Sequence, residues 1–191
     1  MAIRDYIPFI NKNSNVMERK EAPQIYLNSG SPYTRRKDDF KSYADEGYRQ
    51  NAIVFRCVNE IANGAASIPL KVCQGEVELE NHPLINLIKK PNPLQSGVEY
   101  FQSLYSYLLL SGNSFAIKSM IGTQPRELHL LRPDRIEIAP SSTTIPKGYN
   151  YKLNGKIVDY YEADPMTGES LLKHFKTWNP LDDYMGLSPL M

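Results

Sequence analysis

Two stretches of the chain carry apolar residues at spacings of three and four, which is the pattern of an amphipathic helix. The first begins near Tyr48, and its apolar face is Val54, Val58, Ile61, Ala62 and Ala65. The second begins with a Ser-x-x-Glu capping box at Ser96 and Glu99, in which each side chain bonds a free backbone N–H of the other residue. Its apolar stripe is Val98, Phe101, Leu104, Tyr105, Leu108 and Leu109. Gly112 is suited to a left-handed C-cap, so we predict a helix from Ser96 to Ser111 that faces the core.

Shorter apolar runs lie between these two helices. Pro69 ends the first helix and leads into a predicted strand, "IPLKVC" at 68–73, which Gly75 closes with a turn. Pro83 suits the first position of a short helix that Pro91 ends. The residues of this helix expected to point inward are Leu84, Leu87 and Ile88.

From Asn113 onward the pattern changes to the alternation that is typical of strands. The predicted strands are "NSFAIKSMI" with Phe115, Ile117 and Ile121 on one face, "RELHLLRP", "RIEIAP", "YNYKL", "KIVDYY" and "SLLKHFKTW". Pro133-Asp134 predicts a turn, and Asn154-Gly155 predicts a type I′ hairpin. The order of helix, strand, helices and then a meander of strands predicts an α+β fold, with helices packed on a mainly antiparallel sheet.

The first 47 residues have few aliphatic side chains and no periodicity, which predicts an extended or partly disordered arm at 1–47 before a domain at 48–191. The basic run Arg35–Lys37 could bind phosphate, but Asp38-Asp39 follow directly and cancel its charge. We therefore expect a solvated charge run there.

The composition is that of an ordinary globular protein: 191 residues with a formal net charge of +1. This balance gives no overall basic field for tight, sequence-independent binding to nucleic acid. Cys57 and Cys73 do not form a metal-like cluster, so we expect two reduced thiols in a cytoplasmic protein. The longest apolar run, Tyr107–Leu110, is far too short to span a bilayer, and we expect no signal peptide, because Arg4 and Asp5 interrupt the N-terminus.

Candidate chemistry is sparse. The chain has no GxSxG, HExxH or GxxxxGK[ST] motif, and we predict no catalytic, cofactor-binding or metal-binding residues. His82, His129 and His174 are scattered, so turn and strand roles are expected rather than a metal site. The residues Asp134 and Glu137 resemble part of a metal-dependent nuclease pattern, but the expected lysine position holds Ala139. "GNSF" at 112–115 could suggest a nucleophilic serine, but no matching base is apparent, and a polar helix-to-strand turn explains it. Several of the thirteen tyrosines lie in strands, where packing is a more common use than stacking on bases.

Four blocks occur in an order that resembles the phage portal protein family, most closely the branch of long-tailed phages. Their sharpest pieces are "PNP", "LLLSGN", "LRPDR" and "GLSPL", and the resemblance runs from about Val54 to Leu190. It implies a structural, non-enzymatic subunit of a homo-oligomeric ring, usually twelve-fold, at one capsid vertex. Double-stranded DNA would be packaged and ejected through this ring. The implied partners are other portal subunits, the major capsid protein, the terminase large subunit and head-tail adaptors, and the implied location is the virion and, during assembly, the host cytoplasm. The sequence does not indicate which residues would contact DNA.

Ser188 and Pro189 are suited to the N-cap and first position of a helix at the end of the sequence. The resemblance implies that the chain matches the N-terminal, wing-like portion of a portal protein, before the stem and the clip, and we expect its last few residues to be frayed. A truncated prophage gene and one piece of a split protein are both compatible with this. Two other hypotheses stay open: a repurposed protein-interaction module with a wing-like fold, and a metal-dependent nuclease.

Overall fold

The computed structural model of the protein describes residues 40–190, which belong to the second of two units into which the chain divides, Arg36–Met191. Its helical segments are α1 (Phe40–Ser42), the π-helical η2 (Tyr43–Arg49), α2 (Ala52–Ala66), α3 (Pro83–Lys89), α4 (Gly97–Ser111) and the 3-10 turn η3 (Pro133–Arg135). Its strands are β1 (Cys73–Gln74), β2 (Val77–Glu78), β3 (Asn113–Ile121), β4 (Gln124–Leu131), β5 (Ile136–Ala139), β6 (Gly148–Leu153), β7 (Lys156–Glu162) and β8 (Leu172–Lys176).

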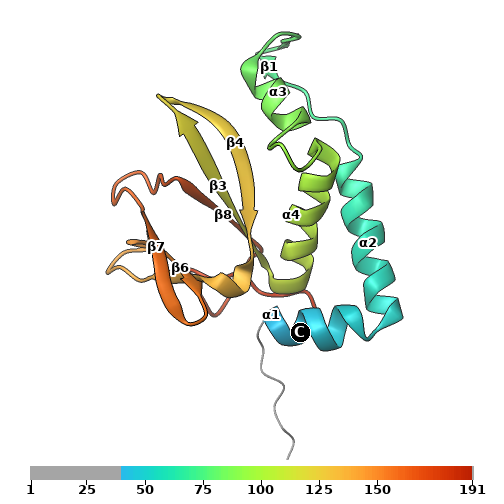
Figure 1. Cartoon of the computed structure of the whole chain (residues 1–191), viewed down its shortest axis with the longest axis vertical. Coiled ribbons are helices and arrows are strands. Elements are labelled where there is room, and N and C mark those ends of the chain that lie inside the picture. The colour runs from blue at the N-terminus through green and yellow to red at the C-terminus, as the bar shows by residue number, and fades with distance from the viewer. Residues whose placement is uncertain (1–39, 191) are drawn as a thin grey trace, which may run out of the picture. The chain divides into compact units, whose positions relative to one another are not determined.

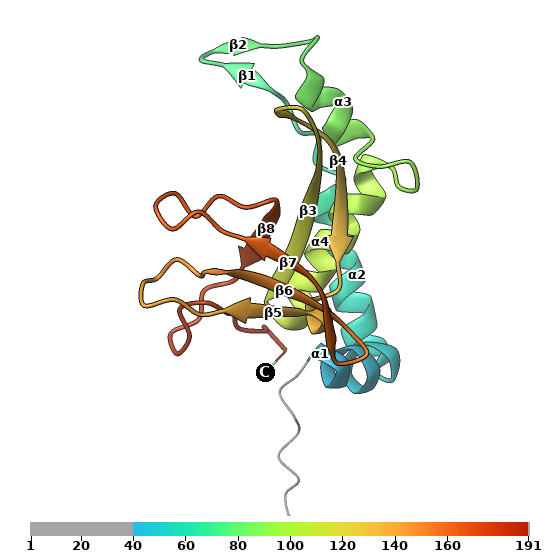
Figure 2. The same ribbon diagram turned by 60° about the vertical axis from the view of Figure 1, so that its left-hand side comes forward.

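Helices and sheets lie in successive layers within this unit (Figures 1 and 2). The middle layer is an antiparallel sheet of order β4-β3-β8, and a second antiparallel sheet of order β5-β6-β7 packs on one of its faces. Helix α4 covers the other face, and α2 packs against α4 on the side away from the sheet. The predicted α+β class is confirmed, with two three-stranded sheets in place of one.

Strand β3 is the middle strand of its sheet, and its first half is buried on both faces. Phe115 is fully buried among side chains of the second sheet and of β8, whereas the next residue, Ala116, packs against Tyr100 and Leu104 of α4. Burial ends part-way along the strand, since Ile121 at its far end is 69% exposed. The β3–β4 register shifts at Ser119/Met120, and the end of this hairpin extends beyond the second sheet (Figure 2).

The predicted helix α4 is confirmed in its start, body and end. The Ser96 side chain accepts from the Glu99 backbone N–H, and the Glu99 carboxylate accepts from the Ser96 N–H at 2.8 Å. The Ser96 N–H, and after it the Ser96 hydroxyl, which donates to the same carboxylate oxygen at 2.9 Å, hold the pKa of the Glu99 carboxyl below its usual value. Gly112 closes the helix at a φ of 73°. The predicted inward stripe is only partly correct, since Val98 is 54% exposed and the buried Tyr100 and Leu110 lie outside that stripe.

Helix α2 and the segment before it depart from the sequence prediction in two ways. The buried residues of α2 are Val58, Ala62 and Ala66, and Ile61 points outward at 57% exposure, because α2 has a single helix, α4, as its main partner. Residues 1–39 of the arm predicted at 1–47 lie outside the described residues. The rest of it, Phe40–Gly47, is helical, so the expectation of extended chain is wrong for this part. Aromatic contacts account for this: the Phe40 ring lies 5.9 Å from that of Tyr107.

The connection between α2 and α4 also contains less regular secondary structure than predicted. The strand predicted at 68–73 is reduced to β1 at Cys73–Gln74. It pairs with the equally short β2 in a hairpin that turns at Gly75. Helix α3 forms as predicted and buries Leu87, but Leu84 is 40% exposed, so its predicted inward position is wrong.

Candidate functional site

Four polar residues of the described range are buried: Asn92, Asn113, Ser114 and Ser188. Buried polar side chains are usually hydrogen-bonded. The side chains of Asn92, Asn113 and Ser188 are, and they show where the fold depends on specific polar contacts, whereas the Ser114 hydroxyl has no hydrogen-bond partner within the described residues. Three of them come from the blocks "PNP", "SGN" and "GLSP", which are far apart in the sequence.

The Asn113 junction comprises Gly112, Asn113, His174, Thr177 and Gly186–Ser188, where the end of α4 meets the segment that follows β8. The Asn113 side chain contacts Gly186 at two points: its Oδ1 accepts from the Gly186 N–H at 2.7 Å, and its Nδ2 donates to the Gly186 oxygen at 3.1 Å. One amide side chain therefore binds the backbone of a residue 73 positions away.

His174 makes a second hydrogen bond to the Asn113 side-chain oxygen. Its Nε2 lies 2.9 Å from Asn113 Oδ1, and because that oxygen can only accept, Nε2 carries the proton. The imidazole stacks on Phe115 with ring centroids 4.3 Å apart. Burial, and after it the charge of Lys176, lower the pKa of His174 to about 4. The ring is therefore neutral at pH 7 and acts as a hydrogen-bond donor.

The last turn of α4 receives the bonds that a helix C-terminus otherwise lacks. The Ser188 hydroxyl donates to the Leu110 oxygen at 2.9 Å, and the Thr177 N–H donates to the Gly112 oxygen at 2.9 Å. Ser188 also accepts from the Leu190 N–H at 3.1 Å, as an N-cap residue does. The expectation of frayed final residues is wrong for Ser188, which is 5% exposed.

Two glycines allow the backbones at this junction to approach. A Cβ at Gly186 would lie 2.1 Å from the Gly112 oxygen, and a Cβ at Gly112 would lie 2.4 Å from the Leu187 carbonyl. Both distances are too short for real Cβ atoms, so any larger residue at either position must move the backbone. This contact explains why glycine stands in "SGN" and in "GLSPL".

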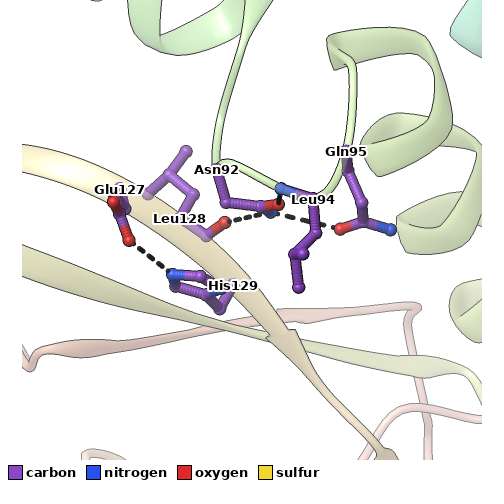
Figure 3. Close-up of polar contacts among 6 residues, drawn as sticks. All are labelled: Asn92, Leu94, Gln95, Glu127, Leu128 and His129. Atoms are coloured by element: carbon purple, nitrogen blue, oxygen red, sulfur yellow. Dashed lines mark hydrogen bonds and ion pairs between the residues drawn. The ribbon is translucent and has the colours of Figure 1, made fainter.

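The Asn92 junction repeats this arrangement at the other end of α4 (Figure 3). Asn92 Nδ2 donates to the Leu128 oxygen at 2.9 Å, and the Leu128 N–H donates to the Pro91 oxygen at 2.8 Å. Within the loop, Asn92 Oδ1 accepts from the Leu94 N–H at 3.0 Å, and Nδ2 is 3.2 Å from the Gln95 side-chain oxygen. The "PNP" loop is thereby held against strand β4.

A groove of about 590 Å³ opens beside the Asn92 junction, between α3, the "PNP" loop and the β3–β4 turn. Its charged lining comes from Lys90, Arg126 and Glu127, and the Glu127 carboxylate is 2.9 Å from His129 Nε2. The groove carries charges of both signs and is open to solvent, which does not indicate one class of ligand.

The two carboxylates of the nuclease hypothesis do not converge. Asp134 makes a two-point ion pair with Arg132, with N–O distances of 3.0 and 2.8 Å. Glu137 lies on the outward face of β5 and pairs with Lys152. Each carboxylate has a local cation as its partner, which argues against a shared metal site.

The other candidate residues are also dispersed. His82 caps α3 by accepting from the Leu84 N–H at 3.2 Å, and His129 and His174 lie in strands, as predicted. Cys57 and Cys73 are exposed free thiols. Within residues 40–190 there is no group of three His, Cys, Asp or Glu that could hold a metal ion. In the same range, no helix is both long enough and apolar enough to cross a membrane.

Sequence reasoning did not identify Asn92 or Asn113 as key residues. The available signals were an asparagine between two prolines, and an asparagine directly after a helix-ending glycine. Asn92 lies in a loop and Asn113 is the first residue of β3 after a helix-ending turn, and an asparagine is ordinary at and beside turns. Only the folded chain shows that each side chain bonds a backbone more than 35 residues away.

Comparison with known proteins gives consistent matches. A family model described as "Phage portal protein" matches residues 52–191. This chain is 38% identical over 149 residues to an uncharacterized protein of Rickettsia bellii (strain RML369-C). It is also 38% identical over 148 residues to an uncharacterized protein of Rickettsia felis (strain ATCC VR-1525 / URRWXCal2). The match covers 76% of this chain but 37% of each relative.

Solved structures give a parallel result. A chain in "Neck of empty GTA particle computed with C6 symmetry" is 36% identical, with a TM-score of 0.73, and the match covers 80% of this chain and 40% of that chain. A chain in "Neck of native GTA particle computed with C12 symmetry" is 34% identical, with a TM-score of 0.68, over 80% and 39% of the two chains. This chain therefore spans about two fifths of the length of the proteins that it matches.

Proposed function

The chain belongs to the phage portal protein family, and from this premise we propose that it is a structural, non-enzymatic part of a portal ring in a phage or gene transfer agent particle. The family match over residues 52–191 carries the proposal. The similar chains in neck structures with C6 and C12 symmetry support a ring of identical subunits.

The arrangement of the sequence blocks agrees with a structural role. The "SGN" and "GLSPL" blocks meet in the Asn113 junction, and "PNP" meets β4 in the Asn92 junction. In "LRPDR", Arg132 pairs with Asp134, and Arg135 lies 3.2 Å from the Tyr151 hydroxyl. The blocks that carry the family resemblance thus hold layers and loops together.

The further parts of the proposal follow from the family. The ring would lie at one capsid vertex, and double-stranded DNA would enter and leave through it. Its neighbours there would be the major capsid protein, the terminase large subunit and a head-tail connector, the last two bound through parts of the protein beyond this chain. The protein would be found in the host cytoplasm during assembly and in the virion afterwards.

Location in the particle is the direct test. An epitope tag on the chain, in cells that assemble particles, should label one vertex of each purified particle when seen by electron microscopy with gold-bound antibody. Label that is spread over the shell, or that is missing from purified particles and found in other complexes, would favour the interaction-module hypothesis instead.

The nuclease hypothesis has its own test. Purified chain incubated with duplex DNA and magnesium or manganese should leave the DNA intact, because Asp134 and Glu137 are each engaged with a separate cation. Cleavage that is lost in both Asp134→Ala and Glu137→Ala would contradict the structural role.

A further inference from the structure

The two outermost layers of the described unit both expose apolar side chains. On α2, Ile53 is 75% and Ile61 is 57% exposed, and they lie on one side of the helix with Cys57 between them. On β7, Ile157 is 57% and Tyr160 is 45% exposed. We call these the α2 stripe (Ile53, Cys57, Ile61) and the β7 patch (Ile157, Tyr160).

The two surfaces point in opposite directions because of the layer order. The buried residues of α2, Val58 and Ala62, face α4, so the α2 stripe faces away from the sheets. Ile157 pairs with Lys152 and Tyr160 with Asn150, on the face of the second sheet opposite to its core residues. Figure 1 shows α2 and β7 at the two sides of the unit, with α4 and the middle sheet between them.

A closed ring needs surfaces placed in this way. Each subunit contacts two neighbours through two different faces. In twelve-fold symmetry, which the neck structure of a similar chain has, one copy is turned by only a twelfth of a full circle relative to the next. The two contact faces of one subunit must then lie on nearly opposite sides. A two-fold dimer would instead use one face twice.

We propose that the α2 stripe of one copy packs against the β7 patch of the next copy in the ring. The occupant of each surface is thus a second copy of this chain, and the inference rests on the proposed portal function. Exposed isoleucines on both outer layers are the apolar contacts that such an interface would bury. The patches are small compared with the ~800 Å² per partner of a stable interface, so one contact alone is weak.

The native cysteines provide a test with a built-in control. The wild-type chain has exposed thiols at Cys57 and Cys73. The double variant Cys73→Ser/Ile157→Cys keeps Cys57 in the α2 stripe and moves the second thiol to the β7 patch. Both proteins are oxidised at the same rising series of concentrations and run on a non-reducing gel.

Because each copy then offers one thiol on each face, head-to-tail contact predicts a ladder of dimers, trimers and larger species that reducing agent removes. The wild-type chain, with its second thiol on β1, should not form this ladder. Adding Ile61→Lys to the double variant should abolish it, with circular dichroism showing that the fold is kept. Disulfide formation needs the two Cα atoms within about 7 Å, so the ladder reports direct contact.

A band pattern that stops at the dimer, or a ladder equal to that of the wild-type chain, would overturn the proposed contact. The gold-labelling experiment is independent of this result. A labelled vertex without the ladder would leave the portal function standing and reject these faces, whereas an unlabelled particle would reject the portal function itself.

Discussion

Replacing Gly186 by alanine is expected to be strongly destabilising, although glycine and alanine differ by one methyl group. Gly186 does not have a positive φ, so its importance comes from space and not from backbone conformation. The added Cβ would lie 2.1 Å from the Gly112 oxygen and 2.8 Å from the Thr177 nitrogen. Both are backbone atoms, so the segment after β8 must move away from the end of α4.

The magnitude follows from two contributions. Forcing a methyl group into a packed site costs about 1–3 kcal/mol. The displacement also weakens the two hydrogen bonds between Asn113 and Gly186, each of which contributes about 0.5–1.5 kcal/mol. We expect a loss of about 3 kcal/mol, which lowers the melting temperature of a domain of this size by roughly 6–12 °C.

The matched control is Gly64→Ala, the same chemical change inside helix α2. A Cβ at Gly64 meets nothing within 4 Å, and alanine is the better helix former by about 0.5–1 kcal/mol. Urea and thermal unfolding, followed by circular dichroism, should therefore shift in opposite directions for the two variants. A Gly186→Ala protein as stable as the wild type would show that the close approach to Gly112 is not present.

Three further predictions concern α4, His174 and the assembly state. Ser96→Ala should cost about 1 kcal/mol through the lost cap, and Leu104→Ala, at a buried position, roughly 2–5 kcal/mol through a cavity; equal unfolding midpoints for the two would contradict the core assignment. The lowered pKa of His174 means that the unfolded chain binds more protons between pH 6.5 and about 4, so stability should fall as pH falls through this window. His174→Gln should flatten that slope in urea titrations; an unchanged slope in this variant would remove His174 as its source. Light scattering on the dilute 191-residue chain should give a monomer or a weak small oligomer, because each outer patch is small; a discrete ring would show that the contact is stronger than its area suggests.

The sequence predicted elements well where local signals agree, and poorly where partners decide. The capping box at Ser96, the apolar stripe and Gly112 all predicted the same helix, and that helix forms. Ile61 looked equivalent to Ala62 by spacing, yet one is outward and the other fully buried. Whether Ile61 is buried depends on how many elements surround α2, and helical periodicity carries no information about that number.

The candidate site was harder to predict than the fold. Asn113 is important because its side chain bonds the backbone of Gly186, and Asn92 because its side chain bonds the backbone of Leu128. The residues of each pair are far apart in the sequence. A hydrogen bond between a side chain and a distant backbone leaves no periodic pattern. The family blocks contain these residues without singling them out, and only the folded chain shows which of them bond distant backbone.

The long separation across the Asn113 junction has a consequence for the order of folding. Asn113 and Gly186 are 73 residues apart, and Ser188 and Leu110 are 78 apart. Contacts of such separation form slowly, because the entropy of closing the intervening loop must be overcome first. During synthesis the segment after β8 leaves the ribosome after strands β1–β8 of the described residues, so the last carbonyls of α4 stay bound to water until then. We therefore expect this junction to close late, and hydrogen exchange during refolding to protect the Gly186 amide after those of β3 and β4.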